Sequence, residues 1–214
     1  MKRYFTLYFL FSANIILQAQ DFNSPVFRGE LVEKYTYPIT GSVYAYSDEF
    51  ETGNVLFNGK RYTDLLLNLD SYRDELQLKG IGTECIALRN SLVGDFNIGK
   101  RNYTAFYGEN CINGLSEGYY QVLYNGERIL LKKIYKNVSE QVHFITGEIT
   151  KVFTTKFRYY LIMNGKVYKI KDDKDLVKFG KEHKGEIKAF IKVQRRRGFE
   201  SEDIMCDVMK IIEE

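Results

Sequence analysis

The chain has 214 residues, of which 44% are hydrophobic and 15% aromatic, and its formal net charge is +3 at pH 7. This hydrophobic content excludes an intrinsically disordered chain, which buries too little apolar surface to fold. Seventeen tyrosines and 15 phenylalanines, with two prolines and no tryptophan, favour β-strands over a helical bundle. The length suits one domain, or one domain with an appendage.

Residues 1–20 have the pattern of a secretory signal peptide. Lys2 and Arg3 give a positive start, residues 5–17 are uncharged and largely apolar, and Ala19 ends a small-residue cleavage motif. The apolar run is too short for a comfortable membrane span, which needs about 20 residues. An uncleaved N-terminal anchor is the alternative. We therefore expect an exported protein, periplasmic, outer-membrane-associated or secreted, with no transmembrane segment in the mature chain.

Residues 21–171 are predicted to form an antiparallel β domain. Residues 41–46 alternate Val43 and Ala45 with tyrosines, which is the period-two pattern of a strand. Asn-Gly pairs between apolar runs indicate tight hairpins, because both residues tolerate positive φ angles. The unequal spacing of these pairs favours one turn type reused in a meander over a repeat array. The pairs are Asn58-Gly59, Asn125-Gly126 and Asn164-Gly165.

Residues 172–214 are predicted to form a C-terminal helical segment packed on the β domain. Ile187 and Ile191 fall on one face of the middle helix, and Ser201 is a suitable N-cap for the last. Helices this short are marginal alone in water, so we expect them to dock on the sheet or on each other. The fold class is therefore α+β: a meander-rich antiparallel sheet, as a sandwich or partial barrel, followed by a helical appendage. The expected helices span residues 174–179, 182–196 and 202–213.

Three cysteines allow one disulfide with one thiol left over. An exported chain passes through an oxidising compartment, where a disulfide persists. Cys85 and Cys111 are the preferred pair because both lie in the β part, and Cys206 lies in the last helix. Three buried free thiols are the alternative.

Two segments resemble uncharacterised exported proteins of Bacteroidota-type bacteria. They are residues 57–76, FNGKRYTDLLLNLDSYRDEL, and residues 159–192, with a tyrosine-rich strand, an Asn-Gly-Lys turn and lysine-rich helices. The resemblance covers about half of the mature chain. It implies an exported, periplasmic or outer-membrane-associated protein of unknown function, and it implies no catalytic residues.

The motifs of several enzyme classes are missing from the sequence. It has no Cys-x-x-Cys, His-Glu-x-x-His or G-x-S-x-G motif, no phosphate loop and no dinucleotide-binding glycine pattern. We expect no cofactor and no metal. One acidic cluster keeps a hydrolase or carbohydrate-active protein open as the alternative function, because glycoside hydrolysis needs two carboxylates. The same side chains could also be solvated surface or bind calcium. The cluster is Asp64, Asp70, Asp74 and Glu75.

Charge is unevenly distributed along the chain. Residues 21–150 carry 13 basic and 17 acidic residues, residues 151–198 carry 15 and 5, and residues 199–214 carry 1 and 6. The basic segment suggests an anionic surface or an unknown envelope protein as partner, and nucleic acid is not expected. Alternatively, the acidic last helix lies along the basic one and neutralises it. The candidate binding residues are Lys188, Lys192, Arg195, Arg196 and Arg197.

These observations favour a non-catalytic binding or structural accessory protein of the cell envelope. The missing enzyme motifs and the resemblance support this hypothesis over the hydrolase.

Overall fold

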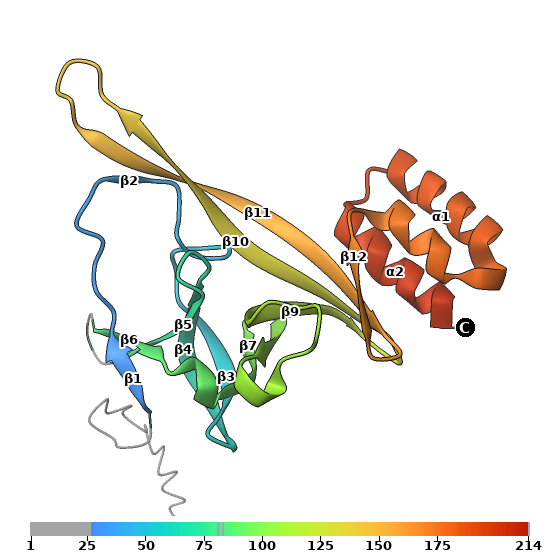
Figure 1. Ribbon diagram of the computed structural model, residues 1–214, viewed down its shortest axis with the longest axis horizontal. Coiled ribbons are helices and arrows are strands. Elements are labelled where there is room, and N and C mark those ends of the chain that lie inside the picture. Colours follow the sequence, from blue (N-terminus) through green and yellow to red (C-terminus); the bar gives the residue numbers. More distant parts are fainter. Residues whose placement is uncertain (1–26, 81, 83, 214) are drawn as a thin grey trace, which may run out of the picture.

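The computed structural model describes residues 27–80, 82 and 84–213. Its strands form one twelve-stranded, mostly antiparallel sheet, and two α-helices follow at the C-terminal end. The predicted α+β class is therefore confirmed (Figure 1). The predicted signal peptide lies outside the described residues.

The strands alternate with short turns along the chain and include two long ones. They are β1 (Gly29–Leu31), β2 (Ile39–Thr40), β3 (Glu51–Phe57), β4 (Lys60–Asp70), β5 (Glu75–Lys79), β6 (Cys85–Leu88), β7 (Val93–Ile98), β8 (Arg101–Phe106), β9 (Gly118–Asn125), β10 (Ile129–Val142), β11 (Ile149–Met163) and β12 (Lys166–Ile170). The helices are the 3-10 turns η1 (Asn90–Leu92), η2 (Gly108–Asn110), η3 (Asp173–Phe179) and η4 (Lys181–His183), and the α-helices α1 (Lys184–Arg196) and α2 (Ser201–Glu213).

The sheet is a meander with two exceptions to sequential pairing along its main path. Its strand order is β1-β6-β5-β4-β3-β7-β8-β9-β10-β11-β12. The pairs β1–β6 and β3–β7 join strands that are distant in sequence, and β2 adds a short parallel pair with β11. Hydrogen bonding between neighbours along the chain thus builds most of the sheet, as the turn pattern predicted.

Two of the three Asn-Gly turns are tight hairpins, and one is not. Asn58 and Asn164 have φ of 50°, and the φ angle of the glycine after each is also positive. A type I′ turn requires positive φ at both positions. Between β9 and β10 the turn is longer, with the Gly126 N–H donating to the carbonyl of Arg128. A Cβ on Gly126 would collide with the Glu213 carboxylate. This glycine therefore makes room for the end of α2, and the prediction of one shared turn type was wrong here.

The described residues form three hydrophobic clusters, and the two larger ones both include residues from the inner end of the β10–β11 hairpin. The first core lies inside the curled sheet from β3 to β9 and includes Ile134 of β10. The second lies between the far end of the sheet and the C-terminal helices, and it includes Leu130 of β10 and Leu161 of β11. The β10–β11 hairpin thus contributes to both cores.

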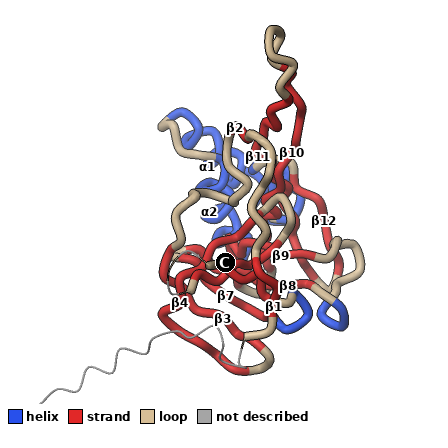
Figure 2. Tube along the Cα trace, turned by 90° about the vertical axis from the view of Figure 1, so that its left-hand side faces the viewer, coloured by secondary structure: helices blue, strands red, loops and turns tan. Residues whose placement is uncertain are grey.

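The outer part of the β10–β11 hairpin extends beyond the rest of the molecule (Figure 1). Figure 2 shows the same hairpin rising clear of the body in a perpendicular view. The strands pair without a break from Ile129↔Ile162 to Val142↔Ile149. The hairpin therefore forms an arm with residues 143–148 at its tip.

The C-terminal helices occur where they were predicted, with different caps. Asp172, and not Asp173, caps η3, its side chain accepting the Lys174 N–H at 3.0 Å. Ser201, the expected N-cap of the last helix, is instead its first residue. Ile204 and Val208 are 1% and 0% exposed, so the last helix is docked and not detached.

Candidate functional site

A pocket of about 450 Å³ lies between η3 and α1. Four of its lining residues belong to α1. They are spaced three or four positions apart, so they lie on one face of that helix. We call it the basic pocket. Its lining residues are Lys174, Val177, Lys188, Ile191, Lys192 and Arg195.

The basic pocket combines cations with an apolar floor. Lys174, Lys188 and Lys192 are exposed, whereas Ile191 is buried and Val177 is half-buried. Within residues 27–80, 82 and 84–213, none of these three lysines has a carboxylate within salt-bridge distance. Their charges are therefore available to a ligand that carries negative charge.

Arg195 fixes one side of the basic pocket. Its Nε lies 3.0 Å from Oδ2 of Asp173, and its Nη2 also contacts the other Asp173 oxygen. Asp173 is fully buried, so this two-point contact supplies the partner that a buried carboxylate requires. The hydrogen bonds to Asp173 raise the pKa of Arg195 further. Arg195 thus positions α1 on η3 and keeps its charge.

The structure brings together three of the five basic residues that the sequence singled out. Lys188, Lys192 and Arg195 line the basic pocket. Arg196 and Arg197 are exposed but do not line it. The contribution of η3 was missed, because the spacing of residues on a single helix gives no sign of which turn packs against it.

The acidic residues of α2 do not neutralise α1. Glu202 lies 2.6 Å from the Lys132 ammonium of β10 and accepts the Tyr159 hydroxyl of β11. Glu213 accepts the Tyr124 hydroxyl and the Arg128 N–H. Among the described residues no ion pair joins α1 to α2. The helices do pack together through apolar side chains, but the expected charge compensation is wrong, because Glu202 and Glu213 contact the sheet and Asp207 pairs with Lys210 of α2 itself.

The predicted carboxylate cluster serves the fold. Asp70 is fully buried at the end of β4. It accepts the Tyr35 hydroxyl at 2.7 Å and the backbone N–H groups of Tyr72 and Arg73 at 2.9 Å each. These bonds close the turn between β4 and β5, so the oxygens of Asp70 are committed to structure.

The other three members of the cluster also have roles or positions that belong to the fold. Asp74 lies 2.7 Å from the Lys133 ammonium and accepts the Tyr107 hydroxyl at 2.9 Å. Burial, and then the charge of Asp70, raise the pKa of Glu75. Asp64 adopts φ of 58° within β4, at the point where the β3–β4 register shifts. The cluster thus links the β4–β5 turn to β10 instead of facing an open cavity as a pair.

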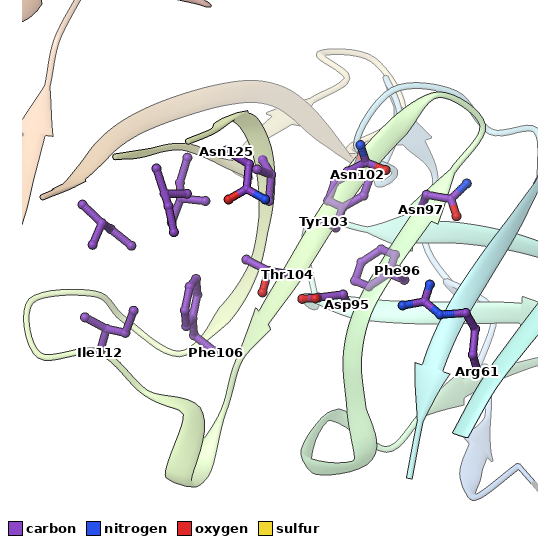
Figure 3. A pocket seen from close by; sticks show the side chains of 14 residues that line it. Arg61, Asp95, Phe96, Asn97, Asn102, Tyr103, Thr104, Phe106, Ile112 and Asn125 are labelled. Atoms are coloured by element: carbon purple, nitrogen blue, oxygen red, sulfur yellow. The ribbon is translucent and has the colours of Figure 1, made fainter. Parts of the chain in front are cut away.

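A second concavity, of about 490 Å³, is lined by residues of β4 and of β7 to β11 (Figure 3). Polar side chains line one side and Phe106 and Ile112 the other. Asp95 is the one carboxylate among its described lining residues, so it does not offer the two carboxylates that glycoside hydrolysis uses. Asn97 is already bonded to Asn54 and to the Gly99 carbonyl. It holds charges of both signs, from Arg61 and Asp95, whereas the three lysines of the basic pocket have no carboxylate within salt-bridge distance among the described residues.

The predicted Cys85–Cys111 disulfide is not formed, and the described cysteines are free thiols. Cys85 lies in β6 and Cys111 follows η2, after β8. Four strands separate β6 from β8 in the sheet. Being in the same β domain is therefore not enough to bring two cysteines together.

Among the described residues, no cluster of three histidine, cysteine or acidic side chains could hold a metal ion. No helix in that part of the chain is long and apolar enough to cross a membrane. Comparison of the chain with protein-family models, curated proteins and solved structures finds no match.

Proposed function

We propose that this chain is an exported binding or structural accessory protein of the cell envelope, without catalytic activity, that holds an anionic partner in its basic pocket. The observation that carries the proposal is the set of three exposed lysines around an apolar floor, with no carboxylate of the described chain within salt-bridge distance of their ammonium groups. The amino-terminal signal pattern of residues 1–20 supports export.

The lining defines the chemistry of the partner. The three ammonium groups favour carboxylate or phosphate groups, and Ile191 and Val177 favour an apolar group beside them. The volume of about 450 Å³ suits one small group or a few side chains. The expected partner therefore presents acidic and apolar groups together.

Binding to a simple polyanion tests this proposal. The full chain is titrated with poly-L-glutamate at low and high salt, and the Lys188→Glu/Lys192→Glu variant is compared with it. We expect at least tenfold weaker binding by that variant and a loss of wild-type binding at high salt, because salt screens exposed charges. A charge-matched control is Lys100→Glu/Lys166→Glu, at two exposed positions outside the pocket. Equal binding by the two variants would refute the role of the basic pocket.

A hydrolase acting through the carboxylates near β4 is not proposed. Asp70 and Asp74 are held by Tyr35, Lys133 and Tyr107, and no observation favours their use on a substrate.

A further inference from the structure

We propose that the partner of the basic pocket is the tip of the β10–β11 arm of a second copy of this chain, so that copies join head to tail. This inference rests on the proposed function, because it names the occupant of the same pocket.

The tip displays apolar side chains that the fold does not use. Phe144 is 101% exposed, Ile145 86% and Val142 65%. An exposed apolar group at the end of a projecting arm is a common sign of an interaction site. The tip therefore supplies the apolar part of the expected partner.

The tip has a defined conformation. The His143 N–H donates to the Glu148 carbonyl, and the Gly147 N–H donates to the His143 carbonyl, each at 2.8 Å. Gly147 has φ of 69°, which a glycine adopts without strain. Because these bonds hold the loop, Phe144 and Ile145 are presented with little ordering cost on binding.

The charge of the tip is opposite to that of the pocket. The tip, residues 143–148, contains Glu148, and the strand end beside it contains Glu140; both are exposed. Residues 139–150 contain no lysine or arginine, and Glu140 lies opposite Lys151 in the β10–β11 register. The basic pocket offers lysines around Ile191 and Val177. Acidic groups beside apolar ones on the tip thus match basic groups beside apolar ones in the pocket. The same acidic groups oppose insertion of the tip into an anionic lipid surface.

The placement of the two surfaces requires a second molecule. The tip and the C-terminal helices lie at opposite ends of the long axis (Figure 1), so a chain cannot fill its own pocket. A contact between two different surfaces repeats from copy to copy and gives rings or filaments. A contact of a few side chains falls below the size of a stable standard interface. We therefore expect assembly that depends on concentration and salt.

Sedimentation velocity of the full chain over a range of concentrations tests the inference. Wild type is expected to form larger species as concentration rises, and Phe144→Ser/Ile145→Ser and Lys188→Glu/Lys192→Glu are each expected to remain monomeric. Leu31→Ser, at a residue 68% exposed in β1, is the control for loss of an exposed apolar side chain and should assemble like wild type. A wild type that stays monomeric, or tip variants that assemble normally, would overturn the inference.

A charge exchange gives the sharper test. Glu140→Lys/Glu148→Lys should not assemble alone, and neither should Lys188→Glu/Lys192→Glu. An equimolar mixture should assemble, because each tip then meets a pocket of opposite charge. Absence of assembly in the mixture would contradict the pairing, even if both variants are folded by circular dichroism.

Two further readouts separate this inference from the proposed function. If the pocket variant loses poly-L-glutamate binding while tip variants assemble normally, the function stands and the inference fails. If the tip variant loses binding to phosphatidylcholine vesicles and assembly is unchanged, the tip meets lipid and the inference also fails. If the pocket variant keeps poly-L-glutamate binding, the proposed function fails first.

Discussion

The ion pair between Lys132 and Glu202 should show a strong asymmetry between its two partners. The Lys132 side chain is 3% exposed and that of Glu202 30%. The Lys132 ammonium also lies 3.1 Å from the Tyr46 hydroxyl and 4.0 Å from the Phe157 ring centroid. Removing the carboxylate would leave a buried cation without a counter-charge, whereas removing the cation would leave a carboxylate that water can reach.

We expect Glu202→Gln to lower the free energy of unfolding by about 2 kcal/mol. This is below the 3–5 kcal/mol for breaking a fully buried pair, because Glu202 is partly exposed. Lys132→Met should cost about 1 kcal/mol or less, because the Glu202 carboxylate left without its partner is 30% exposed and can be hydrated. In the double variant, Glu202→Gln should add little to the cost of Lys132→Met.

Urea unfolding at pH 7 measures these differences. Asp203→Asn is the matched control, because Asp203 lies in the same first turn of α2 and shares the favourable interaction with the helix dipole, worth about 0.5 kcal/mol. If Lys132→Met proves more costly than Glu202→Gln, the burial of the lysine is not the dominant effect and the reasoning is refuted.

Three other predictions concern stability. Burial raises the pKa of seven tyrosines above the ordinary 10.0, that of Tyr44 to about 12. The unfolded chain therefore loses these protons first, and stability should fall as pH rises above 10. Phenolate absorbance should lag behind that of free tyrosine until unfolding, and early ionisation of all tyrosines would contradict this. Gly53→Ala should destabilise the protein by about 1–3 kcal/mol in urea unfolding, because its Cβ would meet the Asn97 carbonyl. The control Gly185→Ala, with open space around it in α1, should stabilise the protein by about 0.5 kcal/mol. Equal effects of the two substitutions would disprove the steric account. Asp70→Asn should lower the thermal midpoint and cost about 1–3 kcal/mol, because a buried charge-assisted acceptor is lost; an unchanged midpoint would mean that this turn does not need the charge.

Local patterns predicted most of the fold. Alternating residues and Asn-Gly pairs located the strands and two type I′ turns, because both signals act within a few residues. The same rule predicted a tight hairpin at Gly126. A glycine is needed there because Glu213, 87 positions later in the sequence, lies against it. Likewise the pairing of β3 with β7 depends on how the sheet curls, which no local pattern records.

The positive charge of the candidate site could be predicted from the sequence, but the arrangement of its residues could not. The basic run on α1 was visible, but the contribution of Lys174 depends on the packing of η3. The prediction that the acidic side chains of the last helix pair with α1 was wrong. It assumed that helices adjacent in sequence also form ion pairs with each other. Lys132 and Arg128 come from the middle of the chain and are brought to α2 by the second core.

The long β10–β11 hairpin also determines how the molecule would respond to tension. A pull on the tip would be carried by two covalent backbones lying side by side, and not by the hydrogen bonds between them. The load would enter the body where β10 pairs with β9 and β11 pairs with β12. Those hydrogen bonds run across the direction of the pull, so they would be loaded together in shear. A row of such molecules joined tip to helix would therefore separate first at the weak contacts between copies, before the strands of any one molecule came apart.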